Sequence, residues 1–393
     1  MASSRYPVLI VLAAVATLVP APARGQGALK TYQTKYYILE TDVDPDRVKE
    51  ITRRITLMAE EYHNRTRGFA GTVKERLPIR VFRRPEDSYA AGGVRGSAGV
   101  FMGDKLMVLA GEQITAGTWH TVQHEGFHQF ALAAIGRGRP PWANEGLAEY
   151  FGEGLYTGDN FYTGLIPPGR LARLRDSLKE HKVRALLDLM RLSHESWNAE
   201  VELAHAKAGQ NYDQAWSMVH FLAQADNGRY RDPFSKFLST VSRGQPWEPA
   251  WARSFGFAVD GFQKRWEDWW LGLSEKPTDD LYAQATLATL TSFYARALSQ
   301  RQSFDSYDDF VKAAQAKELK AHADDWLPPA LLTEALKQAP GLGTWTLEKR
   351  GARRTLVLEL PDGAVLTGDF KVIENRVKSV DVIVKPPKKK GGG

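Results

Sequence analysis

Apolar residues recur at intervals of three or four along most of the chain, and alternate with polar residues in two shorter regions. In residues 44–67 the apolar positions follow helical spacing, at Val48, Ile51, Ile55, Met58 and Tyr62. Strand-like runs surround this predicted helix, at residues 32–42, 77–82, 100–102 and 105–109, with a turn at Gly103–Asp104. Residues 29–113 are therefore predicted to form a β-α-β-β lobe.

The pattern becomes mainly helical from residue 114 to residue 274. Helices are predicted at 118–135, 144–152, 168–179, 185–192, 213–225, 233–242 and 259–271. After Pro277 the pattern predicts a helical accessory segment, residues 275–340, with helices at 279–300, 307–320 and 328–338. Alternation returns at 344–347, 355–360, 365–373 and 377–384, which predicts a small antiparallel β module over residues 341–385. The fold class expected from this order is α+β, with a disordered basic tail at 386–393.

The N-terminus has the features of a secretory signal peptide over residues 1–25. Arg5 precedes the apolar run Val8–Val19, and an A-x-A-like site follows at Ala21–Ala23. The run is short for a bilayer whose hydrocarbon core is about 30 Å thick, although an uncleaved membrane anchor is the alternative. We therefore expect a secreted or periplasmic protein with no stable membrane insertion after cleavage.

Charge and cysteine content narrow the chemistry. The chain has 52 Lys and Arg against 46 Asp and Glu, and no basic stripe is interleaved with aromatic residues, so no nucleic-acid partner is expected. There are no cysteines, which excludes disulfides, thiolate metal ligands, cysteine nucleophiles and a lipoprotein anchor. Any metal ion must be held by His, Asp or Glu.

Residues 124–128 read His-Glu-Gly-Phe-His, inside a predicted helix. His124 and His128 are one helical turn apart and share a face, so two imidazoles can bind one zinc ion. Glu125 projects beside such an ion, where a carboxylate can accept a proton from water. Gly126 weakens a helix by roughly 1 kcal/mol relative to Ala, which indicates close packing or a substrate that approaches the backbone here.

A third ligand is expected from the segment after Pro140–Pro141. Asn144 is a good N-cap residue, so a second helix is predicted to begin at Glu145, whose carboxylate can reach the metal. Glu149 is one turn further on the same face, where it can accept a hydrogen bond from a ligand histidine and fix its tautomer. The alternative for Glu149 is a solvated surface carboxylate.

The two motifs together, H-E-G-F-H at 124–128 and N-E-G-L-A-E-Y-F at 144–151, resemble the gluzincin zinc metallopeptidases. The closer likeness, over residues 32–273, is to bacterial secreted "peptidase MA-like" families. This resemblance implies a thermolysin-like fold of two lobes, zinc held by His124, His128 and Glu145, and Glu125 as general base. The phrase N-Y-D-Q-A-W at 211–216 matches the later helix of these families and implies Tyr212 as an oxyanion donor, unless that tyrosine only packs at a helix start.

One departure from the family bears on the cleavage site. Aminopeptidase-N-type members hold the substrate amine with the Glu of a G-x-M-E-N segment, but the corresponding residues 99–104 read G-V-F-M-G-D. We therefore expect a polypeptide substrate cut internally and paired with residues 105–109 as an edge strand. An aminopeptidase using Glu112 or Glu153, an amide hydrolase of another kind, and a non-catalytic binding protein remain alternatives, and the oligomeric state stays open.

Overall fold

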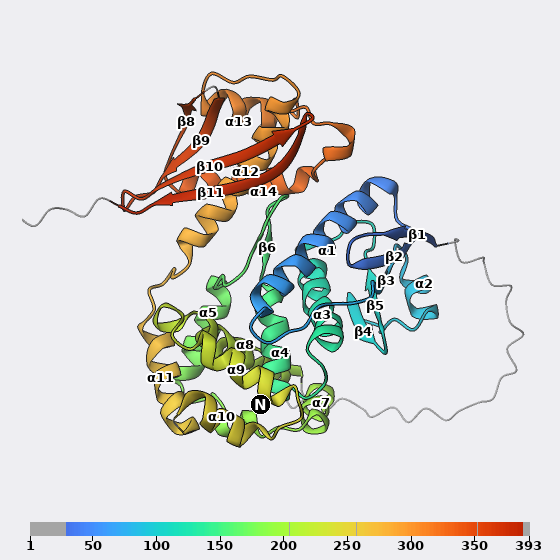
Figure 1. Cartoon of the computed structure of the whole chain (residues 1–393), viewed down its shortest axis with the longest axis vertical. Helices are drawn as coiled ribbons and strands as arrows, with labels where there is room; N and C mark the ends of the chain where they lie inside the picture. The colour runs from blue at the N-terminus through green and yellow to red at the C-terminus, as the bar shows by residue number, and fades with distance from the viewer. Residues whose placement is uncertain (1–28, 204, 257, 352, 388–393) are drawn as a thin grey trace, which may run out of the picture.

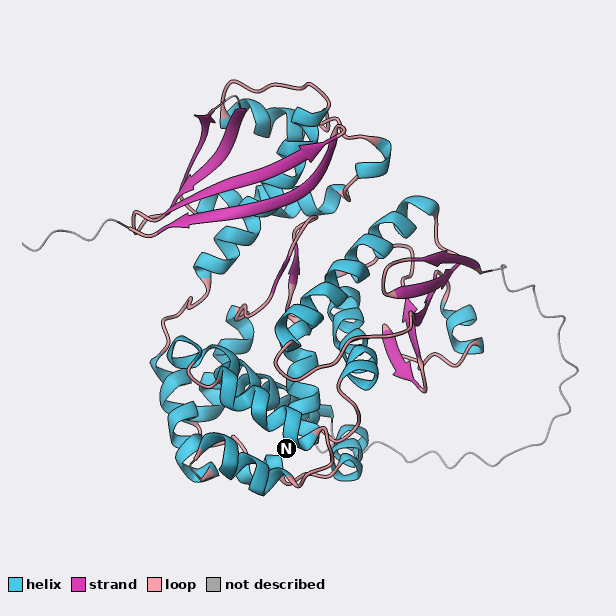
Figure 2. Ribbon diagram, viewed as in Figure 1, coloured by secondary structure: helices cyan, strands magenta, loops and turns pink. Residues whose placement is uncertain are grey.

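The computed structural model describes residues 29–203, 205–256, 258–351 and 353–387. The predicted signal peptide at 1–25 and residues 388–393 of the predicted tail lie outside this range. One larger sheet lies near the N-terminus and another at the C-terminus, and a long run of mostly helical chain separates them in the sequence (Figures 1 and 2). The α+β class predicted from the sequence therefore fits the structure. In the described part of the chain, no helix has the length and apolar character needed to cross a membrane.

The N-terminal sheet contains five strands in the order β1-β2-β3-β5-β4. Its parallel centre requires a crossover between β2 and β3, which the predicted helix supplies as α1 (Pro45–Thr66). The single strand predicted at 32–42 is in fact a hairpin of two strands, and a short helix, α2 (Pro85–Ala90), was not predicted. The strands are β1 (Lys30–Gln33), β2 (Tyr37–Thr41), β3 (Leu77–Phe82), β4 (Gly99–Met102) and β5 (Lys105–Leu109).

The prediction that residues 105–109 form an edge strand is wrong. Strand β5 pairs in parallel with β3 on one side and antiparallel with β4 on the other, so β4 is the edge. The turn that reverses the chain contains Gly103, whose φ of +65° suits a residue without a side chain. Leu106, Met107 and Val108 are buried, as expected for an interior strand.

Two helices that meet in the middle of the molecule carry the histidine and glutamate motifs. Helix α3 (Ala116–Ala134) begins at the N-cap Thr115, whose hydroxyl accepts a hydrogen bond from the amide of Thr118. Helix α4 (Pro141–Gly152) begins earlier than predicted, with Pro140 as its N-cap residue. The prediction of Asn144 as N-cap is therefore wrong. Proline suits the first helical position, because it has no amide hydrogen to leave unpaired there.

One hydrophobic core contains both the N-terminal sheet and the helices up to residue 272. Buried tryptophans, including Trp216, Trp266 and Trp270, pack at its helical end. Helices α7 and α10 were not predicted. The helices after α4 are α5 (Pro168–Lys179), α6 (Leu186–Met190), α7 (His194–Leu203), α8 (His205–Gly228), α9 (Arg231–Val241), α10 (Trp247–Phe255) and α11 (Val259–Gly272).

A second hydrophobic core joins the two accessory segments that the sequence analysis separated. Its sheet is antiparallel in the order β11-β10-β9-β8, and α12 packs against it so closely that a Cβ on Gly368 would lie 2.0 Å from the Thr291 hydroxyl. Helix α13 ends earlier than predicted, before Lys317 adopts a positive φ. The elements are α12 (Asp279–Ser299), α13 (Tyr307–Gln315), α14 (Pro329–Gln338), β8 (Thr344–Arg350), β9 (Arg353–Glu359), β10 (Val365–Ile373) and β11 (Arg376–Lys385).

A short hairpin from the first core makes contacts with the second core, although the chain passes from one core to the other much later, near residue 275. It consists of β6 (Leu155–Tyr156) and β7 (Phe161–Tyr162), and it extends from the end of α4 toward the C-terminal core (Figure 1). At its tip, buried Asp159 forms ion pairs with Arg53 of α1 and Arg296 of α12. The Asn160 side chain donates a hydrogen bond to the carbonyl of Val380 in β11.

Candidate metal centre

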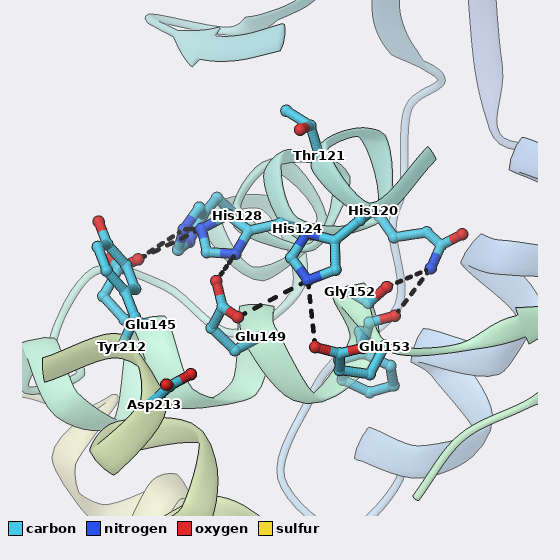
Figure 3. Close-up of polar contacts among 12 residues, drawn as sticks. His120, Thr121, His124, His128, Glu145, Glu149, Gly152, Glu153, Tyr212 and Asp213 are labelled. Atoms are coloured by element: carbon cyan, nitrogen blue, oxygen red, sulfur yellow. Dashed lines mark hydrogen bonds and ion pairs between the residues drawn. The ribbon is translucent and has the colours of Figure 1, made fainter. Parts of the chain in front are cut away.

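The structure brings His124, His128 and Glu145 together, as the sequence predicted. The Nε2 atoms of the two histidines are 3.1 Å apart, because residues four apart on α3 share a face. Glu145 Oε2, on α4, lies 3.4 Å from Nε2 of His124 and 3.3 Å from Nε2 of His128. The three side chains thus offer one ligand atom each to a shared point and could hold a metal ion (Figure 3).

Glycines allow the helices around this point to approach closely. A Cβ on Gly126 would lie 2.8 Å from the side-chain methyl of Met58 on α1, so close packing explains the glycine within the histidine motif. A Cβ on Gly146 of α4 would lie 2.4 Å from the carbonyl oxygen of Ala215 on α8. The position of Glu145 relative to the histidines is therefore set by the close packing of α3 on α1 and of α4 on α8.

The far nitrogen of His124 contacts Glu149, as the sequence predicted. Nδ1 of His124 lies 3.0 Å from Glu149 Oε1, and Glu149 is only 8% exposed, so it is not a solvated surface residue. Burial alone would lower the pKa of His124, but hydrogen bonds to Glu145 and Glu149 outweigh it and raise the pKa to about 10. Despite its burial, the hydrogen bonds and charges of the histidines hold the pKa of Glu145 far below its usual value.

Arg170, on α5, is a residue of this site that the sequence analysis missed. Its guanidinium lies 2.7 Å from carboxylate oxygens of Glu149, Glu153 and Asp213, and it stacks over the Trp216 ring at 4.5 Å. No motif surrounds Arg170 in the sequence, so only the fold shows its place. It fixes Glu149 from the side opposite His124.

His120 is one turn before His124 and approaches a second carboxylate pair. Its Nε2 lies 3.7 Å from Glu149 and 3.6 Å from Glu153, and these three residues are close enough to form another metal-ligand group. Glu149 and Glu153 are also paired with the guanidinium of Arg170, which a metal ion would have to displace, so this second group is a poorer cation site than the first.

Glu125 lies on the side of α3 that faces the edge strand. Its Oε2 accepts a hydrogen bond of 3.0 Å from the backbone amide of Phe101 in β4. A Cβ on Gly99 would lie 3.2 Å from the methyl group of Thr121, one turn before Glu125, so this glycine lets β4 lie close to α3. The edge of the sheet and the candidate base are thus in direct contact.

Asn144 supports the site from inside α4 rather than from its N-cap. Its side-chain nitrogen lies 3.1 Å from Nδ1 of His128 and donates a hydrogen bond of 3.0 Å to Glu145 Oε1. Arg139 donates a hydrogen bond of 3.0 Å to the oxygen of the same amide. Asn144 therefore links two of the three candidate ligands.

The ring of Tyr212, on α8, lies near the ring of His124. The two ring centres are 6.1 Å apart, and Figure 3 places the tyrosine beside Glu145. Burial, followed by the charge of Glu145, raises the pKa of Tyr212 well above its usual value, so the phenol stays protonated. Tyr212, His120, Glu149, Arg170 and Asp213 also line a cavity of about 610 Å³ next to the ligand group.

A comparison with known families finds similarity to one of them. A family model described as "Protein of unknown function (DUF1570)" matches residues 118–248, which extend from α3 to the start of α10. The match includes all three candidate ligands, Glu125 and Tyr212. No curated protein matches the chain.

Proposed function

We propose that this protein is a zinc-dependent metallopeptidase of the gluzincin type. The observation that carries the proposal is the ligand triangle, whose sides measure 3.1, 3.3 and 3.4 Å. Zinc binds imidazole and carboxylate ligands at about 2.0–2.1 Å in a tetrahedron, whose edges are then about 3.3 Å long. The donor set of two histidines and one glutamate also leaves a fourth position open for catalysis.

The chain's own residues divide the work of hydrolysis. His124, His128 and Glu145 hold the ion, which when bound acidifies water and polarises a carbonyl oxygen. Glu125 takes the proton from the attacking water and returns it to the leaving amine. The amide of Phe101 fixes one oxygen of Glu125, so the other is free to accept that proton.

Other side chains position these groups. Tyr212 is protonated beside the ligands and can donate to the oxyanion that develops on the substrate. Glu149 supports proton placement on Nδ1 of His124, which leaves Nε2 as the ligand atom. Asn144 holds Glu145 in the orientation that places Oε2 toward the histidines.

We propose a polypeptide substrate that is cut internally, in an exported protein. Strand β4 ends beside Glu125, so an extended peptide would add to β4, and not to β5 as the sequence suggested. Asp104 is exposed in the turn beyond β4, and the carboxylate of Glu153 already pairs with Arg170, so neither is well placed to hold a free amine. Export rests on the apolar run at 8–19.

Turnover of a mixed peptide library tests this proposal. The zinc-loaded protein should cleave peptides, a chelator should stop cleavage, and Glu125→Gln should bind zinc but lose hydrolysis by about 10²–10⁴-fold. The matched control is Glu112→Gln, which removes a carboxylate that is 80% exposed and should leave the rate unchanged. Zinc bound without any turnover would favour a binding protein, and absence of zinc binding would overturn the proposal.

A further inference from the structure

A second cavity, of about 530 Å³, lies within the C-terminal core and shares no residue with the candidate metal centre. Helices α12, α13 and α14 and the loop after α13 form its walls. Its lining is mainly apolar and includes Phe293, Leu319, Trp326, Leu327, Leu332 and Leu336. A concave apolar site of this size is typical of sites that bury a small molecule.

The charged residues that line this cavity are all basic. Lys317, Lys320 and Lys337 contribute to the lining and are exposed, and none of them forms an ion pair with a residue that the structure describes. Arg296 also lines the cavity, but its guanidinium is already bound by Asp159 and Asp325. No aspartate or glutamate is among the described residues of the lining. The three lysines therefore give the lining of the cavity a net positive charge.

The loop that carries two of the lysines is held in place by hydrogen bonds. The side chain of Gln302 donates to the carbonyl of Glu318 at 2.9 Å and accepts from the amide of Lys320 at 2.6 Å. Further along, Arg296 donates to the carbonyl of Asp325 at 2.8 Å. This wall of the cavity is thus formed before any ligand arrives, which lowers the entropic cost of binding.

We propose that this cavity binds a small amphiphilic anion, namely a carboxylate with an apolar body such as a fatty acid. Each methylene group transferred from water to the apolar lining contributes about 0.8 kcal/mol. The carboxylate would pair with these exposed lysines, and no acidic side chain among the described lining residues repels it. The same lysines disfavour an amphiphile with a cationic head group.

Calorimetric titration of the full chain with sodium dodecanoate, below its micelle concentration, tests the site. A chelator is present throughout, so that the carboxylate cannot bind at the metal centre. We expect saturable binding of one dodecanoate per chain, at least tenfold tighter than binding of dodecyltrimethylammonium, and no measurable binding of butyrate. Equal affinity for the anionic and cationic amphiphiles, or no binding of dodecanoate, would overturn the proposal.

Charge-reversal variants locate the binding to this cavity. The double variant Lys317→Glu, Lys320→Glu should weaken dodecanoate binding by tenfold or more, and because both side chains are exposed, the fold should survive. Lys312→Glu is the matched control, since Lys312 is exposed on α13 but does not line the cavity. This variant should bind dodecanoate with the affinity of the wild type. An equal loss in both variants, or none in the double variant, would place the binding elsewhere.

Discussion

Nδ1 of His124 lies 3.0 Å from Oε1 of Glu149, so a residue of α4 fixes the ring of a candidate ligand on α3. Arg170 contacts the other oxygen of the same carboxylate at 2.7 Å. Glu149 is therefore held from both sides. The orientation of His124 depends on the packing of α3, α4 and α5 together, and not on the histidine motif alone.

Replacing Glu149 by Gln should weaken metal binding while leaving the three ligands in place. Glutamine keeps the size of the side chain but loses the charge that stabilises a proton on Nδ1 of His124. Loss of such a supporting partner typically lowers metal affinity by about 10–100-fold. Competition with a chromophoric chelator measures the zinc affinity, and Glu112→Gln serves as the control. An unchanged affinity in Glu149→Gln would show that this contact does not tune the site.

Tyr212→Phe should lower kcat by about 10²–10³-fold, because it removes one donor to the developing oxyanion. Its zinc content should equal that of the wild type, since Tyr212 is not a ligand. The matched control is Tyr36→Phe, at a half-buried tyrosine whose ring lies 5.3 Å from that of His63, and it should keep full activity. If kcat of Tyr212→Phe stayed at the wild-type level, the tyrosine would be a packing residue only.

A peptide with a blocked N-terminus should be cut as fast as the same peptide with a free amine. A peptide that pairs with the edge strand β4 is bound through its backbone groups, so the substrate needs no free N-terminus. Mass spectrometry of the products distinguishes internal cleavage from stepwise release of single residues. A strong preference for the free amine would instead indicate an aminopeptidase and would require a carboxylate to hold the amine.

His220 should make the fold less stable in acid. Its ring is 2% exposed and contacts the carbonyl of Gly164 at 3.0 Å through Nε2. Burial, assisted by the charge of Arg170, lowers its pKa to about 4, against 6.5 for an ordinary histidine. Between these two values the unfolded chain binds a proton that the folded chain does not, so stability present above pH 6.5 is lost as the pH falls toward 4.

The full size of this loss is about 3 kcal/mol, because one pKa unit corresponds to about 1.4 kcal/mol. The free energy of unfolding, measured with urea at pH 7 and at pH 5, should show the larger part of this loss of stability. The variant His220→Gln lacks the titrating ring, so its stability should fall less than that of the wild type over this range. His181→Asn, at an exposed position with a positive φ that asparagine tolerates, should retain the wild-type pH dependence.

The spacing of residues along the sequence predicted those relationships in the site that hold within a single helix. His124 and His128 share a face because they are four residues apart, and Glu149 follows Glu145 by the same interval. The start of α4 was misjudged because Pro140, Pro141 and Asn144 are all favourable near a helix N-terminus, and Pro141 takes the first position.

Long-range contacts decided what the sequence could not show. The order of β4 and β5 depends on which strand pairs with β3, and both have the same short apolar pattern. Arg170 reaches the site because α5 packs against α8 and α11, and an isolated arginine on a predicted helix indicates no such contact. Likewise, a shared core for residues 275–340 and 341–385 results from the packing of α12 on the C-terminal sheet.

The ion pairs at the tip of the β6–β7 hairpin limit how this protein can be divided. An excised fragment that ends at residue 274 would keep both motif helices but lose Arg296, the most deeply buried partner of Asp159. Asp159 would then depend on Arg53 alone, and Tyr162 would lose the apolar surface it covers. The segment that carries the motifs should therefore be less stable when it is excised than in the full chain. Recombinant fragments should include the C-terminal core, and insertions at the connection near residue 275 should be tolerated better than deletion of that core.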